Sequence, residues 1–224
     1  MKKERNRPNP DSAGPDKMKK KFFALLLIMT MVFTFAACGG SDTAEEPNAQ
    51  ESAEQGEMET EEALPLHHVE MTIKDYGTVK LELDPNEAPL SVENFMNLAE
   101  EGFYDGLKFH RIIDGFMIQG GANEAVQLEP ITGEFSSNGV ENTISHVEGV
   151  ISMARTPDPN SATSQFFITV ADSTFLDGDY AAFGYVTEGL DICKQIAKDA
   201  KPIDNNGTIP EDEQPVIESV KVID

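Results

Sequence analysis

The chain has 224 residues, a length that suits one folded domain with extensions. Its 40 acidic side chains outnumber 17 basic ones and give a formal net charge of −23, which argues against nucleic acid and anionic lipid headgroups as partners of the folded part. Its two cysteines, Cys38 and Cys193, are too few for the disulfide framework of a small secreted protein.

Residues 1–37 have the layout of an export signal. A basic segment at residues 17–21 precedes an apolar run at residues 22–37, and Cys38 follows directly. The run has 16 residues, fewer than the ~20 that a membrane-spanning helix needs. Ala36-Ala37-Cys38 resembles the bacterial lipobox, which implies cleavage before Cys38 and a lipid on that cysteine. An uncleaved N-terminal anchor is the alternative, and both place the rest of the chain in the cell envelope, outside the cytoplasmic membrane.

Residues 38–64 are predicted to be a disordered acidic tether. Residues 39–63 carry nine acidic and no basic side chains, without a periodic apolar face. Such a segment cannot bury enough apolar surface to offset the entropy of ordering it. Repulsion between its like charges favours an extended chain, which would hold the folded domain, residues 65–224, away from the membrane.

The folded domain opens with a hairpin and a helix. Residues 69–73 and 79–83 alternate apolar and polar side chains around an Asp75-Tyr76-Gly77 turn, which predicts two strands with one buried face. Pro89 precedes an apolar stripe at helical spacing, and we therefore predict a helix that runs to about residue 101.

Residues 109–121, with the sequence FHRIIDGFMIQGG, predict a second hairpin around an Asp-Gly turn. A two-residue turn would point Arg111 and Gln119 to opposite faces of this hairpin. A three-residue turn at residues 114–116 would place Arg111 opposite Gln119, on one face with Met117. We predict the second register, because it gives the guanidinium a polar neighbour on an otherwise apolar surface.

The remaining elements are short. Residues 121–148 are rich in Gly, Asn, Ser and Glu and predict long loops. Strands are predicted at residues 150–153, 166–170 and 182–186, a second helix at 189–197, and a closing strand at 216–222. About eight short strands and two helices predict a mainly β domain, and the pattern alone allows either a barrel or a sandwich.

The usual parts of a catalytic site are missing from the sequence. It has no Ser-His-Asp order, metal-ligand cluster, P-loop or dinucleotide-binding glycine motif, so we expect neither a metal nor a cofactor. His146 is predicted to be a hydrogen-bonded loop residue, and Cys193 a small residue of the core or of its boundary. The absence of these catalytic motifs suits a reaction in which no covalent bond breaks.

Three blocks of sequence resemble the cyclophilins, the peptidyl-prolyl cis/trans isomerases, in the order that the family has them. They are FHRIIDGFMIQGG at residues 109–121, GVISMAR at 149–155 with SQFFIT at 164–169, and FLDG at 175–178 with FGYV at 183–186. The resemblance covers most of residues 68–222. It implies a closed eight-stranded antiparallel β-barrel with an α-helix capping each end.

The resemblance also implies a site. Arg111 would donate a hydrogen bond to the prolyl nitrogen as the peptide bond twists, and Gln119 would orient Arg111 and contact the substrate. The residues that match the family's proline pocket are Phe116, Met117, Phe167 and Leu176, and those that match its peptide-backbone contacts are Ala154, Arg155 and Gln165.

Three positions of this site depart from the familiar pattern. Phe175 stands where many members have Trp, and it supplies an apolar face but no donor, which implies weak cyclosporin binding. Tyr180 stands where the pattern has His, and Arg155 where it often has Asn. We expect these two differences to affect the peptide preference more than the activity.

We therefore expect a monomeric, membrane-tethered isomerase that acts on proline-containing segments of exported proteins. The alternative is a proline-peptide clamp or chaperone in which turnover is incidental. The sequence separates the two only through Arg111, because a pure binder needs the apolar pocket but no donor to the prolyl nitrogen. A barrel that carries a small ligand fits poorly, since the blocks place the apolar residues in an external groove.

Overall fold

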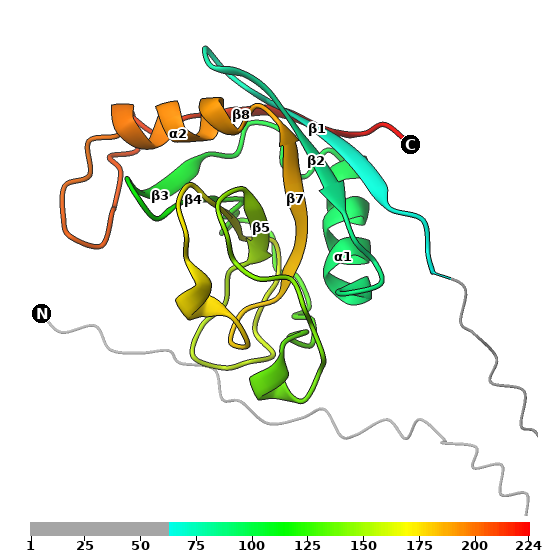
Figure 1. Ribbon diagram of the computed structural model, residues 1–224. Helices are drawn as coiled ribbons and strands as arrows, with labels where there is room; N and C mark the ends of the chain where they lie inside the picture. The colour runs from blue at the N-terminus through cyan, green and yellow to red at the C-terminus, as the bar shows by residue number, and fades with distance from the viewer. Residues whose placement is uncertain (1–62) are drawn as a thin grey trace, which may run out of the picture. The chain divides into compact units, whose positions relative to one another are not determined.

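Eight strands pair into one antiparallel sheet in residues 63–224, the part of the chain that the computed structural model describes (Figure 1). The strands are β1 His67–Ile73, β2 Gly77–Leu83, β3 Phe109–Ile113, β4 Met117–Gly120, β5 Val150–Met153, β6 Phe166–Thr169, β7 Ala182–Glu188 and β8 Ile217–Val222. Their order across the sheet is β3-β4-β6-β5-β7-β2-β1-β8. The predicted export signal, the lipidation site Cys38 and the tether up to residue 62 lie outside the described residues.

The sheet curls into a half-barrel, and the closed barrel that we predicted is not confirmed. The ladder starts at β3 and ends at β8. The outer edge of β3 is occupied by a loop segment instead of β8, because Ile112 N–H donates to Gly207 O at 2.8 Å and Ile209 N–H donates to His110 O at 3.0 Å. The ends of the sheet are linked just before the two strands, by an isolated bridge between Lys108 and Val216 and by hydrogen bonds from Phe109 N–H to Pro215 O at 3.0 Å and from Ile217 N–H to Leu107 O at 2.8 Å.

Two helices pack against the sheet at well-separated places (Figure 1). α1 spans Pro89–Glu100 and α2 spans Leu190–Asp199, so both predicted helices are confirmed. The start of α1 is held by a side chain that sequence reasoning missed: the carboxylate of Glu134, only 2% exposed, accepts hydrogen bonds at 2.8 Å from Leu90 N–H and Ser91 N–H. A carboxylate at this end satisfies free backbone donors and complements the helix dipole.

The core lies inside the curl of the sheet. Phe95 of α1 is its centre, with the rings of Tyr104, Phe166 and Phe183 at centroid distances between 5.0 and 5.5 Å. Cys193 of α2 is fully buried, as predicted, and burial raises the pKa of its thiol to about 12. A smaller apolar cluster around Met117, Phe167 and Leu176 lies apart from this core and belongs to the site described next.

Candidate active site

Register places four side chains in one row across neighbouring strands. Arg111 of β3 lies opposite Gln119 of β4, Gln119 lies opposite Phe167 of β6, and Phe167 lies opposite Ser152 of β5. Side chains alternate along each strand, so these four share the face that points away from the core. The adjacent row points into the core and consists of one residue type: Ile112, Ile118, Ile168 and Ile151.

The β3–β4 hairpin has the predicted three-residue register. Its turn runs from Asp114 to Phe116, and Arg111 Nη1 donates to Gln119 Oε1 at 3.2 Å and to Met117 Sδ at 3.6 Å. Gln119 Nε2 in turn donates to Gln165 Oε1 at 3.1 Å. The guanidinium therefore has the polar neighbour that its charge requires, and Gln119 is itself oriented by a second amide.

Arg111 also has a partner that the sequence did not reveal. Its Nε donates to the backbone carbonyl of Asn206 at 2.8 Å, across a separation of 95 residues. The charged carbon of the guanidinium lies 5.9 Å from the ring centroid of Phe116, within the range of a cation–π contact. Within residues 63–224, no hydrogen bond engages Nη2, so the protons on this nitrogen are available to a bound group.

A pocket of about 460 Å³ opens beside Arg111. Met117, Phe167 and Leu176 are at most 9% exposed and form its apolar interior. Phe175 lies at the surface with 70% of its area exposed, and its ring packs on Phe116 at a centroid distance of 5.4 Å. The residues that line the pocket are Arg111, Phe116, Met117, Gln119, Ala154, Arg155, Phe167, Phe175, Leu176 and Tyr180.

The structure thus brings every predicted site residue of the described part together at one place. All of them line the pocket except Gln165, which accepts a hydrogen bond from Gln119. The lining holds two positive charges and no carboxylate, histidine, serine or cysteine, so it offers a cation and an apolar notch rather than a nucleophile or a general base. The roles of the individual residues stay predictions.

Arg155 makes contacts within the domain that the sequence did not reveal, and its contact with a peptide stays a prediction. Its Nε and Nη2 donate to the Asp179 carbonyl at 2.9 and 2.7 Å, and Nη1 donates to the Thr156 carbonyl at 2.9 Å. The guanidinium lies between two aromatic rings, 5.0 Å from the centroid of Phe135 and 4.7 Å from that of Tyr180. Its side chain therefore ties the end of β5 to the loop that carries Tyr180.

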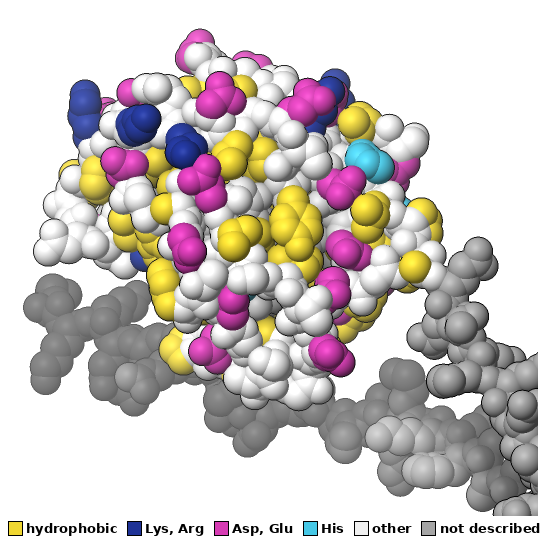
Figure 2. All heavy atoms as spheres, in the orientation of Figure 1, with side chains coloured by type: hydrophobic (Ala, Val, Ile, Leu, Met, Phe, Trp, Pro, Cys, Tyr) yellow, Lys and Arg dark blue, Asp and Glu magenta, His cyan; other side chains and the backbone are white. Residues whose placement is uncertain are grey.

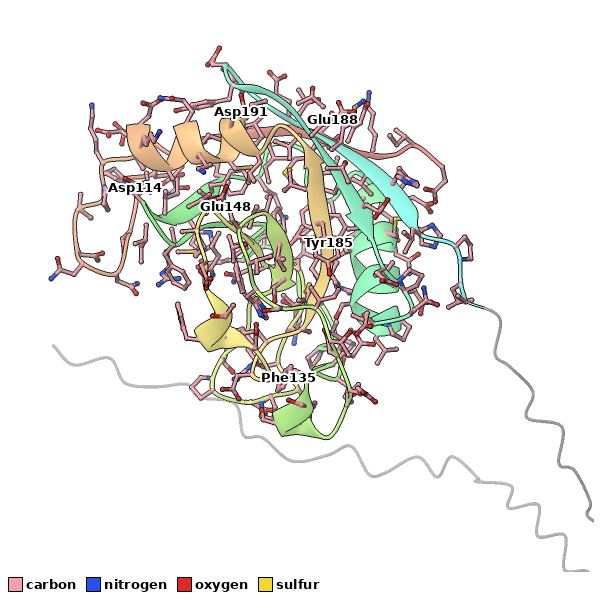
Figure 3. The ribbon with its side chains drawn as sticks, viewed as in Figure 1. Asp114, Phe135, Glu148, Tyr185, Glu188 and Asp191 are labelled. Atoms are coloured by element: carbon pink, nitrogen blue, oxygen red, sulfur yellow. The ribbon has the colours of Figure 1, made fainter. Side chains whose placement is uncertain are left out.

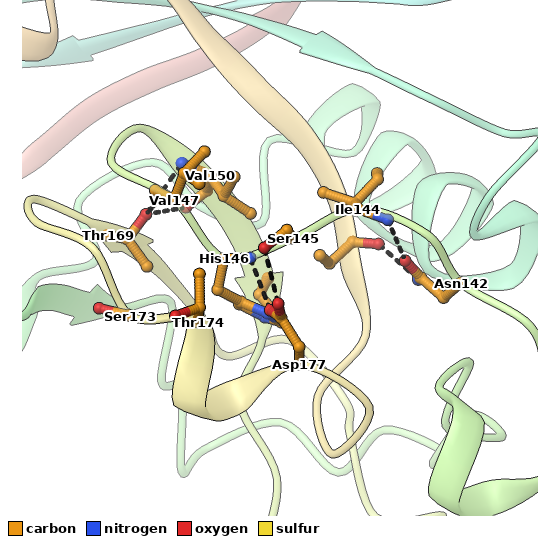
Figure 4. A network of polar contacts seen from close by, with 12 residues as sticks. Asn142, Ile144, Ser145, His146, Val147, Val150, Thr169, Ser173, Thr174 and Asp177 are labelled. Atoms are coloured by element: carbon orange, nitrogen blue, oxygen red, sulfur yellow. Dashed lines mark hydrogen bonds and ion pairs between the residues drawn. The ribbon is translucent and has the colours of Figure 1, made fainter.

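A polar network that includes His146 and Asp177 (Figure 4) packs against Phe167 through the ring of His146. The His146 ring, 1% exposed, stacks on Phe167 at a centroid distance of 6.1 Å and an interplanar angle of 17°. Its Nδ1–H donates to Asp177 Oδ1 at 2.9 Å, and its Nε2 accepts from Ser152 Oγ at 3.1 Å. Ser152 is fully buried, so this Ser-His-Asp contact cannot reach a substrate. The hydrogen-bonded loop histidine that we predicted is confirmed.

The charges of this network follow from its surroundings. Burial lowers the pKa of His146 and outweighs Asp177, which raises it. The lowered pKa favours the neutral imidazole. Partial burial raises the pKa of the Asp177 carboxyl, but hydrogen bonds from His146 N–H and Ser145 outweigh it and hold that pKa below its ordinary value. Asp177 is therefore an ionised acceptor that links the loop before β5 to the loop after β6.

The rest of the domain surface is acidic. Figure 2 shows acidic side chains spread around exposed apolar ones on one face of the domain, and Glu148, Glu188 and Asp191 mark part of it in Figure 3. Residues 64–224 carry 28 acidic and nine basic side chains, and the only two arginines among them, Arg111 and Arg155, both line the pocket. Within residues 63–224, no three potential ligands are grouped to hold a metal ion, and no helix is long and apolar enough to cross a bilayer.

Comparison with known proteins identifies the same residues as a family domain. Residues 68–222 match the family model described as cyclophilin type peptidyl-prolyl cis-trans isomerase/CLD. A peptidyl-prolyl cis-trans isomerase of Acinetobacter baylyi is 44% identical over 140 residues, which cover 60% of this chain and 74% of that protein. One from Streptomyces antibioticus is 43% identical over 161 residues, which cover 66% of this chain and 93% of that protein.

Solved structures agree with the sequence comparison. A cyclophilin from Hirschia baltica has a TM-score of 0.58 and 30% identity, and the match covers 72% of this chain and 75% of that one. A cyclophilin type isomerase from Cryptosporidium parvum, crystallised in the presence of the dipeptide Ala-Pro, has a TM-score of 0.60 and 25% identity, and the match covers 70% of this chain and 99% of that one.

Proposed function

This chain belongs to the cyclophilin-type peptidyl-prolyl cis-trans isomerases, and we propose that it isomerises X-Pro peptide bonds in the pocket beside Arg111. The reaction is a rotation about a C–N bond, with a barrier of ~18–20 kcal/mol from the partial double-bond character of the amide. No bond breaks, so the site needs neither a nucleophile nor a proton acceptor. It needs an interaction that is stronger in the twisted amide than in the planar one.

Arg111 supplies that interaction. As the amide twists, the lone pair of the prolyl nitrogen localises and becomes a hydrogen-bond acceptor, which it is not in the planar amide. Nη2 of Arg111 has no hydrogen-bond partner within residues 63–224, and Arg111 lines the pocket. This is the observation that carries the proposal. The guanidinium keeps its charge at any relevant pH, so the donor is always present.

The apolar interior of the pocket holds the proline ring. Met117, Phe167 and Leu176 offer a surface that excludes water and requires no polar partner. The peptide on either side of the proline would lie along Ala154, Arg155 and Gln165. The backbone N–H of Ala154 already donates to the Gln165 carbonyl at 2.9 Å. This N–H and this carbonyl therefore hold each other, and other polar groups of the three residues would contact the peptide backbone.

Replacement of Arg111 by alanine tests the proposal. In a protease-coupled or NMR-exchange assay on a short Ala-Pro peptide, we expect kcat to fall about 100-fold, the usual cost of one preorganised donor, with a much smaller change in peptide affinity. Arg111→Lys keeps the charge but not the planar fork of donors, and its activity should lie between those of the wild type and Arg111→Ala. Lys221→Ala removes an exposed cation on β8 and serves as the control.

Two results would contradict the assignment. Full activity of Arg111→Ala would show that a hydrogen bond from Arg111 to the prolyl nitrogen is not needed for the reaction. Equal losses of turnover and affinity would favour the proline-peptide clamp, because a pure binder uses Arg111 only to hold the peptide.

We further propose that the isomerase is exported and carries a lipid on Cys38, so that the domain acts as a monomer outside the cytoplasmic membrane on proline-containing segments of exported proteins. What supports this is the order of a basic segment, an apolar run and Ala36-Ala37-Cys38 at the N-terminus, followed by an acidic segment. We also propose that cyclosporin binds weakly, because Phe175 has no donor at the surface of the pocket.

A further inference from the structure

A short loop, residues 203–208, holds Arg111 at its Nε. Arg111 Nε donates to the Asn206 carbonyl, and the loop segment runs along β3 through a bridge between Arg111 and Thr208. Together with the bond from Nη1 to Gln119, this fixes the guanidinium at two of its three nitrogens. The third nitrogen is the one assigned to the substrate, so the two bonds determine where its protons point.

Asp204 organises this loop. Its Oδ1 accepts hydrogen bonds from Asn206 N–H and Thr208 N–H at 3.0 Å each, and its Oδ2 accepts one from Thr208 Oγ1 at 2.8 Å. Its backbone carbonyl accepts a further bond from Gly207 N–H at 3.2 Å. Bonds from Thr208 lower the pKa of the Asp204 carboxyl, so the acceptor is ionised at neutral pH.

The loop is also pressed against β3. Gly207 has a φ of +86°, and a Cβ at this position would lie 2.6 Å from the Ile112 carbonyl oxygen and 2.5 Å from Ile113 Cγ1. Only glycine allows both this backbone conformation and this approach. The Asn206 carbonyl is therefore located from two directions, by the Asp204 carboxylate within the loop and by the contact of Gly207 with the strand that carries Arg111.

We propose that Asp204 is a positioning residue of the isomerase: by folding the loop of residues 203–208, it holds the Asn206 carbonyl against Arg111 Nε and keeps the guanidinium aimed into the pocket. The inference rests on the proposed role of Arg111. A long arginine side chain loses rotamer freedom when it is fixed, and a preformed acceptor makes that loss part of folding rather than of each catalytic event. Loss of the acceptor should lower turnover without touching the apolar pocket.

Asp204→Ala in the full-length chain is the test. We expect kcat on an Ala-Pro peptide to fall about five- to tenfold, the effect of one lost positioning hydrogen bond, with peptide affinity changed less than about twofold. Asp204→Asn keeps an oxygen for the two backbone donors and should restore most of the turnover. The control is Asp84→Ala, which removes a similar turn acceptor for Asn86 N–H, at 2.9 Å, away from the pocket.

A spectroscopic readout separates positioning from general stability. In NMR, the Arg111 Nε–H should exchange slowly with water in the wild type and in Asp204→Asn, and faster in Asp204→Ala. If Asp204→Ala does not fold by circular dichroism, Thr208→Val decides, since it removes only the bond to Oδ2 and should lower kcat about twofold with a measurable rise in Nε–H exchange.

The outcomes distinguish this inference from the function beneath it. If Asp204→Ala turns over at the wild-type rate, or loses turnover while Nε–H stays protected, the positioning role is wrong, although Arg111→Ala would still show its large loss of kcat. If Arg111→Ala keeps full activity, the proposed function fails first.

Discussion

At the scale of single residues, the environment of Arg111 explains why a charge can lie on an apolar strand. Two of its nitrogens are engaged by Gln119 and by the Asn206 carbonyl, and Phe116 lies beside its charged carbon. Each contact lowers the cost of removing the guanidinium from water while leaving one nitrogen for a ligand. A residue with this arrangement is preorganised to act on a group that develops an acceptor during the reaction.

Phe175 is the residue at which inhibitor binding can be tested. It is 70% exposed beside Phe116, so a larger ring at this position would not disturb the core. Phe175→Trp should strengthen cyclosporin inhibition about fivefold, the effect of one added hydrogen bond from the indole N–H, while kcat/KM on an Ala-Pro peptide stays near wild type. Inhibition constants measured on both proteins check this.

Tyr185→Trp gives the matched control, because Tyr185 is also a partly exposed aromatic residue but lies on β7 and does not line the pocket. It should leave the inhibition constant unchanged. Equal potency on the wild type and Phe175→Trp would show that the missing donor is not what limits cyclosporin binding.

At the scale of elements, the pocket depends on one short helical turn, η2 at Thr174–Leu176, and on how its loop is fastened. Phe175 and Leu176 of this turn line the pocket. Asp177 directly after it accepts hydrogen bonds from Ser145 Oγ at 2.6 Å and from His146 N–H at 2.7 Å. The turn thus owes its position to a loop about 30 residues earlier in the chain rather than to its own sequence.

Asp177→Ala should therefore act on both stability and peptide binding. We expect the free energy of unfolding to fall by about 2 kcal/mol, because charged hydrogen bonds are lost at a site that is partly exposed. Peptide affinity should weaken more than kcat, since η2 forms the pocket but does not hold Arg111. Thermal unfolding and isothermal titration with an Ala-Pro peptide measure the two effects.

Asp172→Ala tests whether any loosening of this loop has the same effect. Asp172 accepts bonds from Thr174 N–H and Thr174 Oγ1, at 3.1 and 2.9 Å, so its contacts stay within the loop. This variant should keep the wild-type peptide affinity. If it weakens binding as much as Asp177→Ala does, the link to Ser145 and His146 is not what positions η2.

The contribution of Asp177 should also depend on pH in a defined direction. Its pKa in the folded protein lies below the ordinary value of 3.8, so the unfolded chain binds a proton more readily than the folded one. The free energy of unfolding therefore falls as the carboxylate becomes protonated. The stabilisation is fully present above pH 3.8 and is lost as the pH falls through the lower, folded-state pKa. The difference in Tm between wild type and Asp177→Ala should narrow below that pH.

At the scale of the whole molecule, an acidic domain presents one pocket whose only charges are positive. Residues 64–224 carry 28 acidic and nine basic side chains, which give a strongly negative surface. Arg111 and Arg155 nevertheless both line the pocket. Such a surface is repelled by anionic headgroups, so attachment to a membrane would have to come from a lipid rather than from the domain itself.

The proposed anchor makes a prediction for the full chain. Wild-type protein expressed in bacteria should incorporate labelled palmitate, fractionate with membranes, and have a mature N-terminus at Cys38. Cys38→Ala should lose the label and should no longer fractionate with membranes, because the residue that would carry the lipid is removed. Mass spectrometry of the mature chain and radiolabelling check this.

Cys193→Ala is the control for that experiment. Its thiol is fully buried and its pKa is raised to about 12, so it should take no part in lipidation and the variant should stay labelled. Label retained by Cys38→Ala, or a chain that starts upstream of residue 38, would favour the uncleaved anchor.

Local sequence patterns are enough to predict the strands, the two helices and the hairpin at the centre of the site. The alternation of apolar and polar residues located the strands within two residues of their observed ends. The charge of Arg111 selected the register that faces it with Gln119. These features are local: the period of a strand and the length of a turn are properties of a few consecutive residues.

The surroundings of that hairpin depend on how the whole chain packs. The order β4-β6-β5 sets Phe167 beside Gln119, a loop segment takes the edge of β3 and leaves the barrel half-open, and Asn206 reaches Arg111 from 95 residues away. Such contacts depend on which strands become neighbours, and that is settled by packing of the whole chain, which no local pattern contains.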